Sequence, residues 1–175
     1  DIAGVTELDK LARLAKEARP LLLLSDSTNA REAGHQFSEI DIKIELEKLI
    51  GDAKGRLIIG TFASLLGRIK EIIQIALQHK KKIVIEGRSM RSNIEIAKEL
   101  GYLTFPKDAV IPSEEIHRYK PHEIIVLATG AQGEDRAALM RIANREHRTI
   151  RIEKGDTFVF SSSVVPGNER SVQRL

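Results

Sequence analysis

The sequence predicts an α/β fold, a three-layer domain in which helices flank a parallel-dominated central sheet of about five strands. Short apolar runs alternate along the chain with amphipathic stretches of about ten to fifteen residues, a pattern typical of successive β-α-β units. A chain of 175 residues, 42% of them hydrophobic, is long enough to bury one core. No internal repeat and no low-complexity linker interrupts the pattern, so we expect residues 1–175 to form a single domain.

The strands are predicted from the apolar runs. PLLLLS is a continuous apolar run, which we interpret as a strand buried on both faces. TIRIEKGDTFVFSSS is interpreted as two strands joined across a Gly-Asp turn. In chain order, the predicted strand segments are residues 20–25, 56–62, 82–87, 122–130 and 149–163.

The amphipathic stretches between these runs predict the helices. An opening helix is expected from Leu8, with Thr6 and Asp9 as its N-terminal cap. Ser38 and Ser64 are the predicted N-caps of the next two helices, because a hydroxyl can accept a hydrogen bond from a free N–H of the first turn. In chain order, the further helical segments are residues 38–51, 64–80, 92–101, 111–120 and 134–146. Residues 164–175 are expected to form a loop and the start of a helix.

Small and polar residues follow every predicted strand, in the segments SDSTN (25–29), GTFAS (60–64), EGRSM (86–90), ATGAQGE (128–134) and SSSVVPGNE (161–169). In a parallel sheet these segments share the edge at which α/β proteins bind ligands. Small residues allow a ligand to approach the backbone, and free amides at helix starts attract phosphate oxygens. Arg68 and Arg88 could add charge-assisted contacts. The sequence therefore predicts a binding cleft at this edge.

Each of these segments also has a simpler interpretation when it is taken singly. Asp26 with the residues after it is typical of a side-chain-to-backbone turn. Ser64 is most simply explained as a helix cap, and Gly130 and Gly133 as residues that a strand-to-helix turn requires. The prediction of a cleft depends on all five segments lying together.

The composition excludes several other classes of protein. The excess of 28 basic over 25 acidic residues gives a net charge of +3, which permits nucleic-acid binding without requiring it. The chain has no cysteine, so disulfides and thiolate metal sites are excluded, and a cytoplasmic protein is expected. No apolar run approaches the length of a membrane span, so no membrane association is expected.

No complete catalytic centre is recognisable. The five histidines are scattered and form no His-x-His pair, and for His79, His122 and His147 we expect structural roles at the surface. Nucleophile-elbow, phosphate-binding-lysine and dinucleotide motifs are also missing. Because the chain begins at Asp1 without a Met, we expect it to be an excised piece of a longer protein.

An ordered series of motifs carries a family resemblance. LLLLSDSTNA, TFAS, EGRSM, LGYL, ATGAQGE, GDT and FSSSVVPGNE occur in this order from about residue 21 to about residue 172. Together they resemble the β-CASP domain of bacterial ribonuclease J. Two places depart from the family pattern: Gly67 stands where the family often has a histidine, and REAGHQFSE replaces a stretch that usually contains Pro and Gly-Tyr.

The resemblance implies a function for the longer protein. In the family, a metallo-β-lactamase domain holds two zinc ions, and the β-CASP domain is inserted within it. Single-stranded RNA lies in the cleft between the two domains, where 5′ exonuclease and endonuclease action serve RNA processing and decay. The expected partners are thus RNA and the lactamase domain of the same chain, and the parent protein could form homo-oligomers. The chain alone is expected to be inactive and to bind no zinc.

The resemblance also assigns residue roles. Asp26 falls on the first β-CASP motif and is expected to assist catalysis by orienting a histidine that lies beyond residue 175. Gln132 and Glu134 are expected to organise the loop ATGAQGED. The residues assigned to RNA or phosphate binding are Ser27, Thr28, Asn29, Ser64, Arg68, Arg88, Ser89, Gln132, Glu134, Ser161, Ser162, Ser163 and Asn168.

Two other functions remain open at this point. The same edge could bind a small ligand in a stand-alone nucleotide- or phosphate-binding domain. The chain could also be a non-catalytic interaction module that regulates a partner nuclease. A titration that compares 5′-phosphorylated single-stranded RNA with mononucleotides separates the first alternative from RNA binding.

Overall fold

The fold is described from a computed structural model, which covers residues 7–27, 30–31, 33–34 and 37–175. The chain divides into two compact units, residues 1–42 and residues 43–175. The first unit contains the helix α1 (Leu8–Ala18), which confirms the predicted opening helix. The predicted cap residue Thr6 lies outside the described residues.

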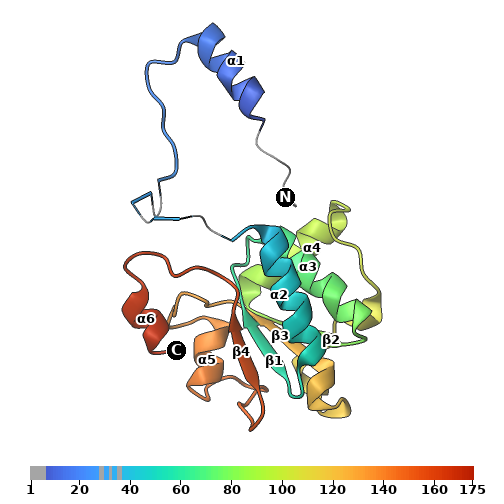
Figure 1. The fold of residues 1–175 in the computed structure, drawn as a ribbon. Coiled ribbons are helices and arrows are strands. Elements are labelled where there is room, and N and C mark those ends of the chain that lie inside the picture. Colours follow the sequence, from blue (N-terminus) through green and yellow to red (C-terminus); the bar gives the residue numbers. More distant parts are fainter. Residues whose placement is uncertain (1–6, 28–29, 32, 35–36) are drawn as a thin grey trace. The chain divides into compact units, whose positions relative to one another are not determined.

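The second unit is built on a parallel sheet, which confirms the predicted α/β class (Figure 1). Its strands are β1 (Leu57–Gly60), β2 (Lys82–Glu86), β3 (Ile124–Ala128) and β4 (Thr157–Phe160), in the spatial order β2-β3-β1-β4. All three strand pairs are parallel. The described residues thus form four strands, against an expectation of about five.

Helices connect the strands. Helix α2 leads into β1, α3 and α4 connect the next strands, α5 follows β3, and α6 ends the chain (Figure 1). Their bounds are α2 (Glu39–Asp52), α3 (Leu66–Gln78), α4 (Arg88–Glu99), α5 (Ala138–Ala143) and α6 (Glu169–Gln173). Three short 3₁₀ helices precede β3, namely η1 (Lys107–Ala109), η2 (Ser113–Arg118) and η3 (Pro121–Glu123). None of the helices within the described ranges has the length and hydrophobicity needed to cross a bilayer.

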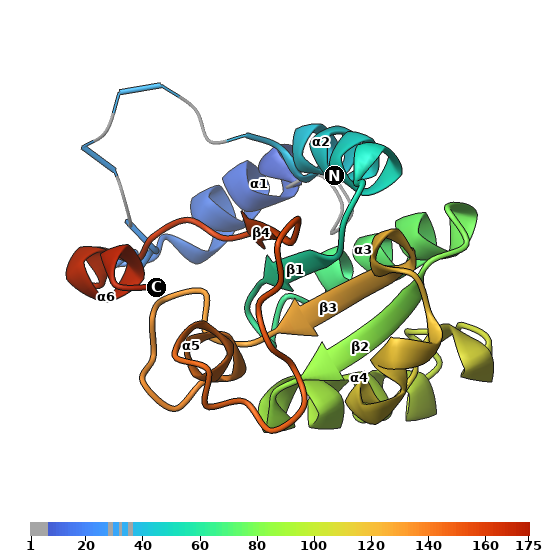
Figure 2. The same ribbon diagram turned by 90° about the horizontal axis from the view of Figure 1, so that it is seen from below.

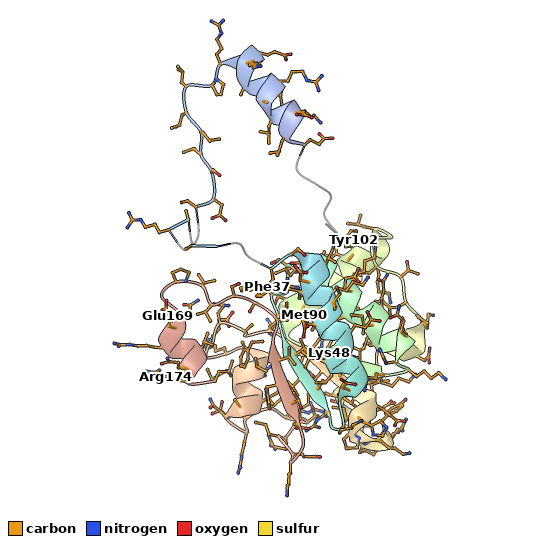
Figure 3. The ribbon with its side chains drawn as sticks, in the orientation of Figure 1. Phe37, Lys48, Met90, Tyr102, Glu169 and Arg174 are labelled. Carbon is orange, nitrogen blue, oxygen red and sulfur yellow. The ribbon has the colours of Figure 1, made fainter. Side chains whose placement is uncertain are left out.

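The core lies on both faces of the sheet. One face packs against α5, and its buried cluster includes Ile58, Val84, Val126, Leu139 and Ile142. Because side chains alternate along a strand, the residues between these face the other side, where Figure 2 shows α3 opposite to α5. The isoleucines of α3 are fully or almost fully buried at positions 69, 72, 73 and 75. Met90 of α4, labelled in Figure 3, is also fully buried. Burial of each such side chain contributes roughly 1.5–3 kcal/mol to the free energy of folding.

The predicted strand at residues 20–25 is wrong. Residues 21–24 form no strand, and their leucine side chains are 72–104% exposed. They belong to the first unit, in which no strand is formed by the described residues. An apolar run can form a buried strand only where a neighbouring strand accepts its backbone hydrogen bonds, and a local sequence pattern does not contain that partner.

Several other boundaries differ from the predictions. Residues 149–153 form no strand, so β4 stands alone where two strands were expected. Helix α3 has Leu65 as its N-cap without a side-chain hydrogen bond, so Ser64 is not the cap. Helix α4 begins at Arg88, four residues before the predicted start. The helix predicted at residues 134–146 is reduced to α5, because residues 134–137 form turns.

Candidate ligand-binding edge of the sheet

The strand register brings four of the five predicted loops to one edge. Gly60 pairs with Ala128 and with Phe160, and Ala128 pairs with Glu86, so the four strands end in one row. Backbone hydrogen bonds continue one step beyond this row: Thr61 N donates to Ala128 O at 3.2 Å, and Ser161 N donates to Gly60 O at 2.8 Å. The prediction that EGRSM and SSSVV share an edge is confirmed.

Glycines allow the loops to pass close to one another at this edge. Gly87 has φ +118°, and a Cβ atom there would lie 2.4 Å from Thr129 Oγ1. Gly133 has φ +72°, and its Cβ atom would lie 2.4 Å from the carbonyl of Ser171. A side chain at Gly87 would therefore collide with the loop after β3, one at Gly133 would collide with α6, and either would also strain the backbone. The glycines of EGRSM and ATGAQGE are required by this packing.

Arg68 is buried and bound to the protein backbone, unlike an arginine whose guanidinium is exposed to bind a phosphate. Its side chain is only 7% exposed, and its Nη1 donates to the carbonyl of Ser161 at 2.8 Å. Thr61 Oγ1 donates to the same carbonyl at 3.3 Å. Arg68 therefore fixes the start of the loop that follows β4. Its direct contact with RNA, and that of the buried Ser161, stay predictions.

Gln132 connects two of the loops. Its side-chain amide donates to Ser163 O at 2.8 Å and lies 3.4 Å from Ser162 Oγ, while its Oε1 accepts the N–H of Val165 at 2.7 Å. Asn168 Nδ2 approaches the same oxygen at 3.5 Å. Gln132 itself is 5% exposed. The loop ATGAQGED thus holds the segment SSSVVPGNE in place.

Glu134 completes this arrangement from within the same loop. Its carboxylate accepts the backbone N–H of Gln132 at 3.1 Å, which fixes the turn between them. The Glu134 side chain is otherwise exposed. The organising contacts expected of Gln132 and Glu134 are therefore present in the structure, whereas their contact with RNA stays a prediction.

Arg88 and Ser89 are the exposed polar residues at the end of β2. Both lie in the first turn of α4, whose N-cap Gly87 provides no side-chain hydrogen bond. The first N–H groups of a helix lack acceptors within the helix and carry a partial positive charge. This turn can therefore offer backbone amides, a hydroxyl and a guanidinium to an anion. Ser64 and Ser163 are also exposed, and Ser162 and Asn168 are half-buried.

A buried ionisable cluster was missed by the sequence analysis. His147, expected at the surface, is 5% exposed, and its Nε2 lies 3.4 Å from Oε2 of the buried Glu86. Arg91 Nη2 donates to the same oxygen at 2.7 Å, and Arg91 Nε donates to Ile85 O at 2.9 Å. These contacts join the end of β2, the first turn of α4 and the turn after α5. The one signal in the sequence is a glutamate that ends an apolar strand.

The tautomer of His147 follows from its contacts. Its Nδ1 accepts the backbone N–H of Ile150 at 3.2 Å, so the neutral ring carries its proton on Nε2 and donates toward Glu86. Burial lowers the pKa of His147, and the charges of Arg141 and Arg91 lower it further, although Glu86 opposes the shift. A neutral imidazole is therefore favoured at this position.

The remaining candidate residues belong to the first unit. Asp26 and Ser27 are exposed and lie outside regular secondary structure, and Ser25 Oγ donates to Asp26 O at 3.3 Å. Thr28 and Asn29 lie outside the described residues. The roles of all four stay predictions.

The described residues were also tested for a fit to zinc. No three His, Cys, Asp or Glu side chains in the described ranges come close enough together to hold a metal ion. A hydrolytic zinc centre needs three protein ligands and one open position. We therefore assign no zinc ligand to the described part of the chain and derive no step through a metal.

Comparison with known proteins agrees with this arrangement. Residues 54–175 match the family described as Ribonuclease J, beta-CASP domain. Proteins named Ribonuclease J from Corynebacterium glutamicum, Helicobacter pylori and Thermus thermophilus are 44%, 41% and 42% identical over 95%, 97% and 98% of this chain. The aligned regions cover 23%, 24% and 30% of those relatives, so the chain spans about a quarter of their length.

The family match begins just before β1 and covers the whole sheet with its four loops. It therefore includes the segments EGRSM, ATGAQGE and SSSVVPGNE, whose contacts build the candidate edge. The chain belongs to the ribonuclease J β-CASP domain family.

Proposed function

We propose that this chain is the RNA-binding β-CASP part of a zinc-dependent ribonuclease of the ribonuclease J type. The parent protein would cleave RNA as a 5′-3′ exonuclease and endonuclease in cytoplasmic RNA processing and decay. The observation that carries the proposal is the single row of strand ends, from which four polar loops of a ribonuclease J domain leave the sheet together.

The first turn of α4 is the proposed phosphate contact. Arg88 supplies a permanent charge with two-pronged hydrogen-bonding geometry, and Ser89 adds a hydroxyl donor. The free amides of the turn add to the attraction, because they carry the positive end of the helix dipole. With a net charge of +3, affinity would come from this local arrangement rather than from the whole molecule.

The other edge residues are proposed to hold the loops in a binding geometry. Arg68 and Gln132 are buried, and both donate to backbone carbonyls of the segment after β4. This leaves Ser163 exposed beside the half-buried Ser162 and Asn168. We propose that these three side chains contact RNA, while Arg68 and Gln132 act by supporting them.

The zinc chemistry is proposed to belong to the rest of the parent protein. Two zinc ions bound in a metallo-β-lactamase domain would activate a water molecule for attack on the phosphodiester. RNA and that domain are the proposed partners, and homo-oligomers of the parent protein are an additional proposal. The contribution of this chain would be to bind and orient RNA.

The test is a titration with 5′-phosphorylated single-stranded RNA at several salt concentrations. Arg88→Ala should weaken binding by about tenfold and make the salt dependence shallower by about one unit, because one phosphate contact is lost. Arg118→Ala is the matched control, because Arg118 is an exposed arginine in η2, which precedes β3 and is not one of the loops at the candidate edge. Its effect should be small.

Melting temperatures separate binding from folding in this test. Arg88 is exposed, so its removal should leave the melting temperature nearly unchanged. Equal RNA affinity in both variants would refute the proposed contact. Tight binding of mononucleotides with no gain from RNA would instead favour a small-ligand domain.

A further inference from the structure

A basic pocket lies at the opposite end of the sheet from the candidate edge. Its volume is about 390 Å³, and it is lined by Gly51, Ala53, Lys54, His79, Lys81 and His122. Lys81 directly precedes β2, and Lys54 and His122 lie a few residues before β1 and β3. Because the strands are parallel, their amino ends share one edge, and the pocket is therefore distinct from the loops proposed to bind RNA.

Every ionisable residue that lines the pocket is a base. Lys54 and Lys81 bring two positive charges, and the two imidazoles bring N–H donors. No described carboxylate forms an ion pair with either lysine. Glu123, whose carboxylate accepts the backbone N–H of Lys120 at 2.8 Å, acts on Lys81 through its charge without forming an ion pair with it.

Lys81 is the most constrained of these residues. Lys81 is buried, with 7% of its surface exposed, and its Nζ donates to the carbonyl of His122 at 2.5 Å. Burial lowers the pKa of Lys81; the charge of Glu123 opposes this shift, and the charge of Lys54 adds to it. Two ammonium groups therefore repel each other across a partly desolvated pocket, and an anion between them would relieve this repulsion.

The negative ends of two helix dipoles offset part of the positive charge of the pocket. Helix α2 ends beside Gly51, and His79 is the C-cap of α3, so carbonyl groups at both ends attract nearby bases. Gly51 also leaves room for the imidazole, because a Cβ atom there would lie 3.0 Å from His79 Cε1. Dipoles of this kind offset about half a charge each, so the two helix ends alone do not balance the two lysines that line the pocket.

We infer that this pocket binds a phosphate group, either inorganic phosphate or the phosphate of a small phosphomonoester. Ammonium groups bind phosphate as point charges, and the imidazole N–H groups can donate to its remaining oxygens. The volume exceeds the roughly 30 Å³ of one water molecule many times, so a phosphate with an attached group fits. The inference does not depend on RNA binding at the other edge.

The test uses the histidine rings as local reporters. The 175-residue chain is titrated with inorganic phosphate at constant pH and constant ionic strength, with chloride as the compensating ion. Ring signals of His79 and His122 should shift in a saturable way, whereas those of His117, in η2 and outside the pocket, should not. Chloride alone should produce no such shift.

Three variants assign the shifts to the pocket. Lys54→Ala and Lys81→Met should each weaken phosphate binding by about tenfold, since each removes one charged donor. Lys48→Ala is the matched control, because Lys48 is an exposed lysine on α2 (labelled in Figure 3) and its loss changes the net charge equally. Arg88→Ala should leave phosphate binding at the pocket unchanged.

Two results would overturn the inference. The first is the lack of saturable shifts at His79 and His122, or equal shifts in Lys54→Ala and Lys48→Ala. The second is displacement of phosphate from the pocket of the Arg88→Ala variant by 5′-phosphorylated RNA, which would make RNA the ligand. If Lys81→Met does not fold, the comparison of Lys54→Ala with Lys48→Ala decides alone.

Discussion

His147 shows how one buried side chain makes this domain sensitive to pH. Burial lowers the pKa of His147 below its value in the unfolded chain, which is about 6.5. Protonation therefore favours the unfolded chain. The stabilising contribution of the neutral ring is complete above about pH 6.5 and is lost as the pH falls through the range below it.

We predict that the melting temperature falls as the pH is lowered from about 7.5 to about 5.5, and that it falls less in the His147→Gln variant. The variant loses the titrating group, so its melting temperature should depend less on pH even if it is lower throughout. His117→Gln serves as the control for an exposed histidine. An equal or steeper loss in His147→Gln than in the wild-type chain would contradict the assignment.

At the scale of residues, the sequence predicts which side chains follow the strands but not where they point. Arg68 and Arg88 look alike in the sequence, and both were assigned to phosphate. In the structure Arg68 is buried against Ser161, whereas Arg88 is exposed. The cluster of Glu86, Arg91 and His147 joins residues about sixty positions apart, and only the folded sheet brings them together.

At the scale of elements, one buried amide connects the loop after β3 to the loop after β4. Gln132 accepts the N–H of Val165 and donates to Ser163 O. Removing this side chain breaks two part-buried hydrogen bonds, each of which contributes about 0.5–1.5 kcal/mol to stability. The segment SSSVVPGNE would then lose the contacts that fix its geometry, while the sheet itself keeps all its strand pairs.

We therefore predict that Gln132→Ala speeds hydrogen exchange of the Val165 amide and weakens RNA binding together. Amides inside β1 and β3 should keep their protection. Gln74→Ala, which removes an exposed glutamine from α3, is the control and should change neither quantity. Unchanged exchange at Val165 in Gln132→Ala would show that the amide does not hold the loop.

Elements with their own local signals were predicted well. Helix α2 begins one residue after the predicted cap Ser38, whose Oγ accepts the N–H of Asp41 while the Asp41 carboxylate accepts the N–H of Ser38. Strands β1, β2 and β3 also lie within their predicted runs. The run at residues 20–25 failed because a strand depends on a partner that its own sequence does not specify.

At the scale of the whole molecule, the parallel sheet separates two polar ends. The carboxyl ends of the strands meet the loops of the family motifs, and the amino ends meet the basic pocket. The alternation of strands and helices was sufficient to predict the first end, because parallel strands must release their loops at one edge. The second end could not be predicted, since its lysines and histidines come from connections that carry no motif.

Asp26 gives a test in the longer protein. We propose from the family resemblance that Asp26 belongs to the first β-CASP motif, where its carboxylate would accept a hydrogen bond from an imidazole and hold its tautomer. Asp26→Asn should then keep fold, zinc content and RNA affinity but lower turnover by about tenfold or more, because supporting carboxylates typically have effects of this size. The measurements are single-turnover cleavage, metal content and RNA affinity in the parent protein.

The same substitution separates this role from a structural one. Asn is a good turn residue and would satisfy the same backbone amides as Asp, so a turn-forming Asp26 would allow nearly full activity. Asn cannot replace a carboxylate that takes part in proton handling, because it carries no charge and its amide donates where the carboxylate accepts. Ser25→Ala in the preceding position is the control, since its hydroxyl donates to the Asp26 carbonyl at 3.3 Å and not to the Asp26 carboxylate. Nearly full turnover in Asp26→Asn would therefore remove Asp26 from the catalytic machinery and leave it as a residue of the turn.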